Sequence, residues 1–548
     1  MCSPSCPYGA QCGNNGCGGK CGSGCSSGYL CVNYKCIKQQ TSSGGSGGGG
    51  SSSGSSGGGS SEEGSSDSGD SSSTPDCTDT CSSLEYACGV QTICGKSVNC
   101  GTCKSGEYCS NGVCLLNVTG NTYFVATNGN DAWSGNFTHP WATWEKAFTS
   151  SSVNPGDIVY FRGGIYYTSV TQGSYNGLNG TVNSPILFYN YPNENPIIDG
   201  INRTSPSGGI AFYYAHNLKF KGLTIRNLPQ LDYNYKGSGF YFYYSGNISL
   251  ENCIAHNISA RGFYFLEPEG NIYVENCDSY NNIDYLSDVP GNHGDGFIVW
   301  DSPRDEQDLS ARVVFKNCRA WNNADDGFDA QAEGYIELNN CWAFNNGLKQ
   351  FNIGGFGVKL GSSEMNSSNL IRKVNNCIFA NNKVYGLTTT DRQHPARPMN
   401  IYNNFAYNSG IADDGFDGCG FGILNPYSSD ELKLRRVFRN NIAYKNEFQD
   451  VFVNSVYTHE YNSWDSPVNV TDDDFVSLDC SQLYSPRELD GSLPKNVTFG
   501  HLAQGSDLID AGVLIPGYHC STAGAHPGEN CAEWYGSAPD LGPFESNY

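Results

Sequence analysis

The sequence contains little charge. Asp, Glu, Lys and Arg make up 16% of the 548 residues, and the acids outnumber the bases so that the formal net charge is −23. An acidic chain is a poor partner for nucleic acids, because phosphate backbones select basic surfaces. The sequence also lacks any apolar run of the roughly 18 residues that cross a bilayer. We therefore expect neither a nucleic-acid-binding nor a membrane-spanning protein.

Histidine is absent from the first 115 residues, although 16 of the 25 cysteines lie there in two groups of eight with similar spacing. The modules that these groups define, 1–37 and 77–115, are each too small for a hydrophobic core, and disulfides normally stabilise such domains. Zinc is the alternative, but the lack of histidine and the even number of cysteines favour four bridges in each module.

The cysteines also indicate the compartment, because disulfides persist in oxidising surroundings. Nine N-x-Ser/Thr sequons agree with a secreted glycoprotein. No charged and apolar leader is visible, so we expect the sequence to be a mature form. We predict an extracellular protein and expect it to be a monomer.

A linker of serine and glycine, residues 38–76, separates the two modules. This composition cannot bury a core and is typical of a flexible tether. Two cross-linked modules on a tether suggest a ligand in the cell wall or in an enzyme complex. A protease-resistant spacer is the alternative.

Residues 120–548 contain an internal repeat of short alternating segments that end in asparagine, as strands of a solenoid would. Asparagine suits a corner because it tolerates the left-handed backbone conformation and can bond to its copies in neighbouring coils. The corners are Asn227, Asn257, Asn281, Asn322, Asn345, Asn381 and Asn408. We predict an all-β fold of stacked parallel strands, with residues 123–148 at its start.

Cysteine is the second residue of five of these repeats, at positions 253, 277, 318, 341 and 377. We interpret them as small buried apolar residues, although spacing alone also allows a disulfide. For the remaining cysteines, proximity favours a bridge between Cys520 and Cys531. Asn257 lies in a sequon, but we expect it to stay unglycosylated because it belongs to the corner column.

A second motif, glycine followed by a large apolar residue, recurs after each corner. The apolar residue should point inward and its neighbours outward. One outward column is Tyr241, Tyr264, Ile298, Asp329, Lys359 and Thr388, and the residues before glycine are Ser238, Arg261, Asp295, Asp326, Phe356 and Tyr385. The two columns concentrate acids and one lysine in three consecutive coils.

The acids of this cluster are Asp295, Asp325, Asp326 and Asp329. Four carboxylates within about two coils should repel one another unless a cation lies among them, and hard oxygen ligands suit calcium. Asp-Gly turns and a surface ion pair between Asp329 and Lys359 are the alternatives. A further acidic run, Asp413, Asp414 and Asp417, has no lysine on the next coil, so we interpret it as a turn or a secondary ion site.

The motifs HGDGF, NNADDGFD and GVKLG, followed by DDDFVSLD, DGSLP and GSDLIDAG, resemble polysaccharide lyase family nine. The resemblance covers about residues 120–548 and implies a right-handed parallel β-helix with pectate lyase activity. It further implies that Asp295, Asp325, Asp326 and Asp329 hold calcium and that Lys359 is the Brønsted base. The cysteine-rich modules lie outside the resemblance.

The chemistry of the cluster agrees with this activity. Calcium can neutralise the carboxylate of a galacturonate and stabilise the enolate-like intermediate that forms when a lysine removes the C5 proton. Arg392, His394 and Arg397 are candidates for binding further uronates of pectate, and Tyr264 for stacking on a sugar ring. Loop arginines are often merely solvated, however, and an aromatic column can also stabilise the sheet.

Three other functions stay open. A polygalacturonase-like hydrolase would use clustered aspartates, but it needs a protonated acid opposite a base. A non-catalytic β-helix that binds the cell wall would not need Lys359. A lyase for another uronate, such as alginate, would use similar chemistry.

Overall fold

The computed structural model divides the chain into two compact units, 1–76 and 77–548. In the first unit, β1 (Tyr29–Val32) pairs antiparallel with β2 (Lys35–Lys38). The disulfides predicted for module 1–37 lie outside the described residues. The described residues are 29–32, 35–38, 78–84, 86–169, 171–174, 177–203, 209–233, 237–300, 311–332, 334–351, 353–361, 370–390, 398–410, 418–424, 436–454, 457–465, 467–526, 529 and 531–547.

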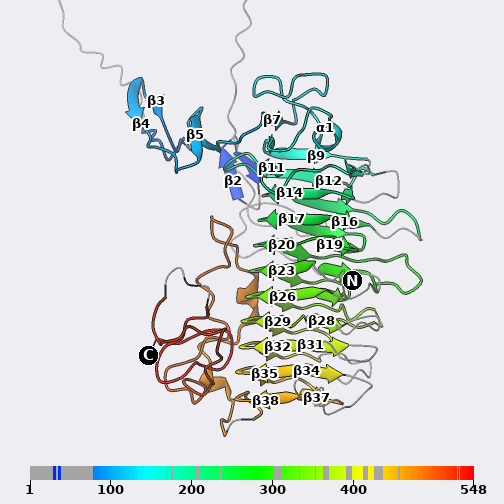
Figure 1. Ribbon diagram of the computed structural model, residues 1–548, viewed down its shortest axis with the longest axis vertical. Coiled ribbons are helices and arrows are strands. Elements are labelled where there is room, and N and C mark those ends of the chain that lie inside the picture. The colour runs from blue at the N-terminus through cyan, green and yellow to red at the C-terminus, as the bar shows by residue number, and fades with distance from the viewer. Residues whose placement is uncertain are drawn as a thin grey trace, which may run out of the picture. The chain divides into compact units, whose positions relative to one another are not determined.

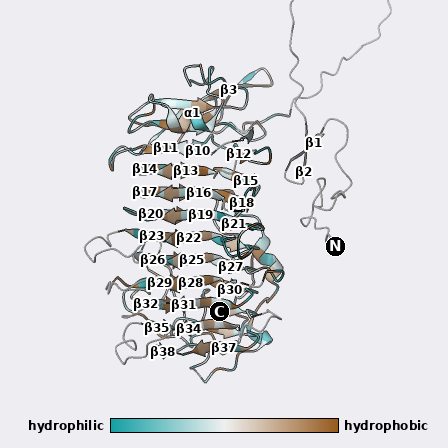
Figure 2. Cartoon of the chain, turned by 90° about the vertical axis from the view of Figure 1, so that its right-hand side faces the viewer, coloured by the Kyte–Doolittle hydropathy of each residue, from teal (hydrophilic) through white to brown (hydrophobic). Residues whose placement is uncertain are grey.

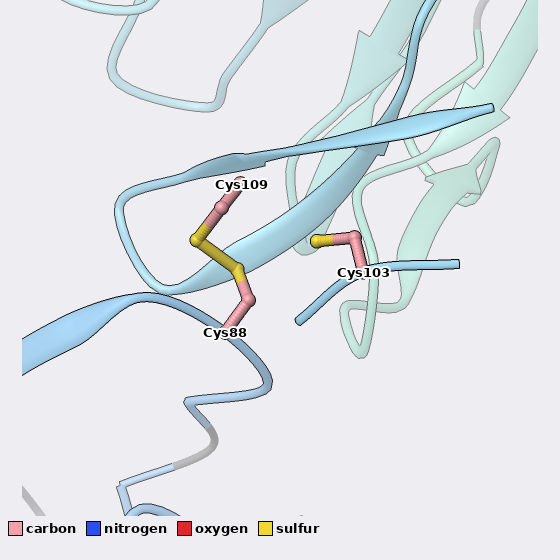
Figure 3. Close-up of side chains that lie close together, drawn as sticks. All are labelled: Cys88, Cys103 and Cys109. Carbon is pink, nitrogen blue, oxygen red and sulfur yellow. A yellow bond between two sulfur atoms is a disulfide. The ribbon is translucent and has the colours of Figure 1, made fainter. Parts of the chain in front are cut away.

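The second cysteine-rich module consists of two antiparallel hairpins. β3 (Val90–Ile93) pairs with β4 (Lys96–Asn99), and β5 (Glu107–Ser110) pairs with β6 (Val113–Leu116). Among its described residues, three disulfides cross-link the module: Cys81–Cys100, Cys88–Cys109 and Cys103–Cys114. Figure 3 shows the bond between Cys88 and Cys109, with Cys103 beside it. The prediction of disulfides is confirmed for these six cysteines, and cross-linked sulfurs offer no thiolate for zinc.

From residue 122 the chain winds through coils that contribute one strand to each of three parallel sheets (Figure 1). The site sheet, seen face-on in Figure 2, consists of β10 (Gln172–Ser174), β13 (Ile210–Tyr213), β16 (Ser238–Tyr243), β19 (Arg261–Leu266), β22 (Phe297–Trp300), β25 (Phe328–Gln331), β28 (Val358–Gly361), β31 (Tyr385–Thr390), β34 (Cys419–Leu424) and β37 (Gln449–Val453).

The second and third sheets complete each coil. The second consists of β7 (Thr122–Val125), β8 (Ile158–Phe161), β11 (Ile186–Asn190), β14 (His216–Lys221), β17 (Gly246–Glu251), β20 (Ile272–Glu275), β23 (Arg312–Lys316), β26 (Tyr335–Asn339), β29 (Arg372–Asn375), β32 (Met399–Tyr402), β35 (Arg436–Arg439) and β38 (Thr458–Glu460). The third consists of β9 (Gly164–Tyr167), β12 (Pro196–Asp199), β15 (Thr224–Leu228), β18 (Ile254–Ile258), β21 (Asp278–Tyr280), β24 (Arg319–Trp321), β27 (Trp342–Phe344), β30 (Ile378–Ala380), β33 (Phe405–Tyr407) and β36 (Ile442–Tyr444). The predicted parallel β-helix is confirmed.

The apolar residue that follows each motif glycine lies in the core, as predicted. Phe240, Phe263, Phe297 and Phe328 form one column, and consecutive ring centroids are 4.8 Å, 4.8 Å and 4.9 Å apart. These spacings match the distance between hydrogen-bonded strands. The inward column therefore sets the register that also aligns the outward side chains.

The seven predicted asparagine corners all adopt the left-handed conformation, with φ between 49° and 56°. Their amides bond between coils in places: Asn257 Nδ2 donates to Asn227 Oδ1 at 3.2 Å, and Asn408 Nδ2 donates to Asn381 Oδ1 at 2.7 Å. The prediction of asparagine corners is confirmed.

A second asparagine ladder lies one residue after several of these corners and is fully buried. Asn282 donates to Asn323 at 2.9 Å, Asn323 to Asn346 at 3.0 Å, and Asn346 to Asn382 at 3.1 Å, each from Nδ2 to Oδ1. Sequence analysis missed this ladder, although the doubled asparagine of four consecutive repeats is its signal.

The five repeat cysteines are buried and free, as predicted. Each thiol donates to the backbone carbonyl two residues earlier, for example Cys253 Sγ to Glu251 O at 3.4 Å and Cys377 Sγ to Asn375 O at 3.1 Å. They fill small spaces at a corner of the coil. The predicted bridge between Cys520 and Cys531 is also present.

The N-terminal end of the solenoid is covered by a helix. Helix α1 (Trp144–Thr149) buries Trp144 and Phe148, and the Phe148 ring lies 5.0 Å from Phe188 and 5.1 Å from Phe212. The predicted start of the domain therefore closes the first coils. Leu116 N of the cysteine-rich module donates to Tyr160 Oη at 3.1 Å, which joins the module to the same compact unit.

The C-terminal arm, residues 467–547, runs along the third sheet and contains the short 3₁₀ helices η3 (Asp472–Asp474) and η4 (Cys480–Tyr484). Its apolar side chains share a core cluster with strand residues such as Phe344 and Phe405. Figure 1 shows the arm beside the coils of the C-terminal half. Among the described residues, no helix has the length and apolar character needed to cross a membrane.

Candidate active site

The acidic cluster lies on the outer face of the site sheet, where the strand register aligns its residues. Tyr264 pairs with Ile298, Ile298 with Asp329, and Asp329 with Lys359 in successive parallel strands. The outward column predicted from the sequence is therefore correct. Asp329 comes from β25 and Lys359 from β28, one coil later.

The other acids precede the strands and are fixed by backbone hydrogen bonds. Asp326 N donates to Asp295 Oδ1 at 3.1 Å, and Phe356 N donates to Asp326 Oδ1 at 2.9 Å. The backbone of Gly296 in turn donates to Asp326 O at 3.0 Å. The carboxylates of Asp295 and Asp326 are thus each bonded to the next coil, which fixes their positions before any ligand binds.

Lys359 is the cation of this cluster. Its Nζ lies 3.4 Å from both Asp326 Oδ2 and Asp329 Oδ2. The lysine side chain is 20% exposed, whereas Asp326 is fully buried and Asp329 is 8% exposed. The amine therefore stands where it can reach both the carboxylates and a molecule bound on the outer face.

The carboxylates raise one another's pKa. Burial, followed by the charges of Asp326 and Asp329, raises the pKa of Asp295 well above its usual range. Burial, followed by the charges of Asp326 and Asp295, also raises the pKa of Asp325 well above its usual range. Burial raises the pKa of Asp326 to about 6, against the attraction of Lys359. The single positive charge of Lys359 thus does not neutralise the negative charge of the four buried carboxylates.

The pKa of Lys359 is raised as well. Burial alone would lower it, but the carboxylates of Asp329 and Asp326 outweigh burial and favour the charged amine. A further positive charge among the carboxylates would oppose this effect and bring the lysine closer to neutrality.

Three of the four predicted ligands converge. Carboxylate oxygens of Asp295, Asp325 and Asp326 lie within 4.8 Å of one another. Asp329 lies outside this group and faces Lys359, but its Oδ1 is buried and has no hydrogen-bond partner. Buried, hard oxygen donors with an unsatisfied acceptor beside them fit the preferences of calcium, so these residues could hold that ion.

Of the remaining predicted site residues, Tyr264 lies in the described part of the chain. Tyr264 lies on the outer face two coils before Asp329, and its ring stacks on Tyr241 with centroids 5.2 Å apart. The three candidates for binding uronates and the second acidic run lie outside the described residues. They are Arg392, His394 and Arg397, and Asp413, Asp414 and Asp417.

Sequence analysis missed the buried residue that shapes the loop before Asp295. Asp284 is fully buried; it accepts from Ser287 Oγ at 2.5 Å and from His293 N at 3.2 Å. Gly291 N also donates to Asp284 O at 2.7 Å. The HGDGF motif contains His293, so an acid nine residues earlier was the available signal.

Comparison with known proteins agrees with this architecture. The model of the Pel9A-like right-handed β-helix region matches residues 123–420. Pectate lyase L of Dickeya dadantii is 28% identical, and the match covers 78% of this chain and 90% of that protein. Pectate lyase PEL9 of Emericella nidulans is 23% identical, over 68% of this chain and 90% of that protein.

Two solved structures resemble the chain over most of their length. The crystal structure of pectate lyase Pel9A has a TM-score of 0.57 at 26% identity and covers 78% of this chain and 97% of its own. A rhamnogalacturonan lyase has a TM-score of 0.56 at 25% identity, with 70% and 97% covered. The chain therefore belongs to the Pel9A-like right-handed β-helix family, which confirms its resemblance to polysaccharide lyase family nine.

Proposed function

We propose that the protein is an extracellular, calcium-dependent pectate lyase in which Lys359 is the base. The observation that carries this proposal is the position of Lys359 Nζ, 3.4 Å from Asp326 and Asp329 at the edge of a buried cluster of four carboxylates. The similarity to pectate lyases over 78% of the chain supports the choice of substrate.

Calcium, when held by Asp295, Asp325 and Asp326, would neutralise a substrate carboxylate and so acidify the hydrogen on its C5 carbon. Asp329 and Asp326 hold the amine of Lys359 at the outer face. A base must be neutral near the working pH, so Lys359 requires that the charge of these carboxylates be compensated.

In the reaction, Lys359 Nζ accepts the C5 proton, and a double bond forms between C5 and C4. The bond between C4 and the glycosidic oxygen breaks, and water protonates the leaving oxygen. Tyr264, two coils before Asp329, would stack on a neighbouring sugar ring. The net charge of −23 disfavours an acidic substrate in general, so its binding depends on local cations.

The disulfides of the described residues in the second module, together with Cys520–Cys531 in the C-terminal arm, support an extracellular location. The tethered modules would bind the cell wall or an enzyme complex, a role separate from catalysis.

A rhamnogalacturonan lyase is the second candidate, because that structure matches the chain almost as well as pectate lyase Pel9A does. The two functions share the elimination chemistry and differ in the sugars that flank the cleaved bond.

The test is the ultraviolet absorbance of the new carbon–carbon double bond. The protein is incubated with polygalacturonate or with rhamnogalacturonan, each with calcium or with a chelator. We expect absorbance to rise with polygalacturonate and calcium only. New reducing ends without absorbance would indicate a hydrolase, and a rise with rhamnogalacturonan alone would favour the second candidate. No cleavage of either polymer would contradict both lyase functions.

A further inference from the structure

The ten strands of the site sheet contain two cationic residues, Lys359 and Arg261. Lys359 lies in the acidic cluster. Arg261 is the first residue of β19, and the next residue, Gly262, donates from its backbone N to Asp295 O at 2.9 Å. Arg261 therefore lies one coil before the first acid of the cluster, in the column of residues that precede the motif glycines.

The side chain of Arg261 lies on the outer face of the sheet. Its guanidinium carbon is 4.6 Å from the centroid of the Tyr264 ring, and Tyr264 belongs to the outward column that continues to Asp329. Stacking on an aromatic face leaves the edge of a guanidinium free to donate hydrogen bonds. Tyr264 thus orients Arg261 without using its donors.

Arg261 makes no direct contact with a carboxylate of the described residues, although its charge opposes the rise in the pKa of Asp295. It forms no ion pair with any residue in the described part of the chain, and its Nε is buried without a hydrogen-bond partner. Several other arginines of the solenoid form ion pairs, such as Arg162 with Glu194 at 2.7 Å and Arg319 with Asp278 at 2.8 Å. A buried donor without a partner destabilises a fold unless a ligand accepts from it.

A planar guanidinium pairs best with a planar anion, because two parallel N–H groups match the two oxygens of a carboxylate. The strand of Arg261 lies two coils from that of Asp329, roughly 10 Å at the spacing of neighbouring strands. A polymer that places one unit at Lys359 and continues along the sheet toward β19 brings a later unit to Arg261.

We propose that Arg261, held by Tyr264, binds the carboxylate of a second uronate in the same polymer chain and so selects substrates with several acidic sugars. This specificity site rests on the proposed lyase function, because the polymer is placed by the reaction at Lys359. It also supplies a cation that an acidic protein needs to hold an acidic substrate.

The test compares Arg261→Gln with Arg312→Gln. Arg312 is a matched control because its guanidinium also lies 4.6 Å from a tyrosine ring, that of Tyr335, but on the second sheet. Both changes are made in the full chain that carries Lys359→Ala, so that the probe is not cleaved. Calorimetry in the presence of calcium then measures binding of an oligogalacturonate and of its methyl ester.

We expect Arg261→Gln to weaken binding of the free oligogalacturonate by about ten- to a hundredfold, as for a lost charge-assisted pair. Binding of the methyl ester should change little, and Arg312→Gln should match its parent with both probes. Arg261→Lys keeps the positive charge without the planar guanidinium and should recover part of the affinity. Such recovery would show that the loss in Arg261→Gln does not come from misfolding.

Equal binding by the Arg261→Gln and Arg312→Gln proteins would overturn the proposal, as would an equal loss for the free oligomer and its ester. Failure of the proposed function looks different. In that case the protein with Lys359 intact forms no double bond, whatever Arg261 contributes to binding. Dependence of binding on Arg261 would then still support a uronate site.

Discussion

At the scale of single residues, the site is a balance of charge between buried acids and two cations. The carboxylates of Asp295, Asp325 and Asp326 converge. Lys359 contacts Asp326 of this group and the neighbouring Asp329. The repulsion raises the pKa of Asp295 and Asp325, so the acids favour any additional cation.

Replacing Asp325 by Asn should therefore change stability in opposite directions with and without calcium. With a chelator the variant should unfold at a higher temperature than the wild type, because one repelling charge is gone. With calcium it should gain less from the ion, because the site loses a charged ligand and its affinity falls by about tenfold or more. Thermal unfolding over a range of calcium concentrations measures both effects.

Asp288→Asn is the control, because Asp288 is an exposed acid in the loop before the cluster. It should follow the wild type at every calcium concentration. If Asp325→Asn also follows the wild type, calcium does not bind at these carboxylates.

At the scale of elements, the corners of each coil hold the strands in register. The corner asparagines provide the left-handed turn, and the buried ladder of Asn282, Asn323, Asn346 and Asn382 bonds consecutive coils. Asn346 also donates to Ala320 O at 3.1 Å. Removing one member leaves buried partners on both sides without a bond.

We expect Asn346→Ala to lower the free energy of unfolding by about 3 kcal/mol, since unsatisfied buried groups cost about 1–3 kcal/mol each. Asn281→Gly should change stability much less, because glycine accepts the left-handed conformation and Asn281 is exposed. Chemical denaturation of the two variants compares them. Equal losses would contradict this, because they would show that the corner side chain contributes as much as the ladder.

The C-terminal arm contains a second group of acids. Glu545 accepts from Asp540 N at 3.1 Å, and burial, followed by the charge of Asp540, raises the pKa of Glu545 to about 8. The folded arm therefore holds a proton on Glu545 that the unfolded chain releases near pH 4.5. Stability from this group is present at low pH and is lost as the pH rises toward 8.

Glu545→Gln should remove that part of the pH dependence. We expect the variant to match the wild type near pH 4 and to be more stable than it near pH 8. Denaturation curves at a series of pH values test this. A variant whose stability falls with pH as steeply as that of the wild type would rule out Glu545 as the cause.

Sequence reasoning went furthest where a residue type repeats. The corner asparagines, the free cysteines and the column from Tyr264 to Lys359 were all predicted, because stacked coils place equivalent residues in line. The buried ladder was not predicted, because the sequence does not show which asparagine of a doubled pair faces the core. The packing of the C-terminal arm on the third sheet was not predicted, because that segment contains no repeat.

The candidate site was predicted as a set of residues but not as a geometry. Which carboxylates converge depends on the loops before the strands, and such loops follow no period. Asp284 organises one of these loops from within the core, and Arg261 stands alone as a cation in a column of mixed residues. The spacing of the repeats reveals neither position, although Asp284 lies nine residues before His293 of the HGDGF motif.

At the scale of the whole molecule, the chain combines disulfide-bonded and free cysteines in one compact unit. The cysteine-rich module depends on cross-links because it has few buried apolar residues, whereas the solenoid has a continuous core that contains the free thiols. Reduction should therefore affect the two parts differently.

We expect a reductant followed by an alkylating reagent to label Cys81, Cys88 and their partners while the column cysteines, such as Cys277, stay unmodified until the solenoid unfolds. Mass spectrometry of peptides from reduced and denatured samples measures the order. Simultaneous labelling of Cys88 and Cys277 would show that the solenoid does not fold independently of the cross-links.

The central claim is that Lys359 removes the proton in an elimination. The most direct test is the rate of double-bond formation from polygalacturonate, with calcium, by Lys359→Ala and by the control Lys373→Ala, whose lysine lies on the second sheet. We predict that Lys359→Ala lowers kcat by about a thousandfold, as for loss of a general base. Its thermal stability and its affinity for calcium should match those of the wild type, and the kcat of Lys373→Ala should be unchanged. Turnover by Lys359→Ala at the rate of Lys373→Ala would contradict the account.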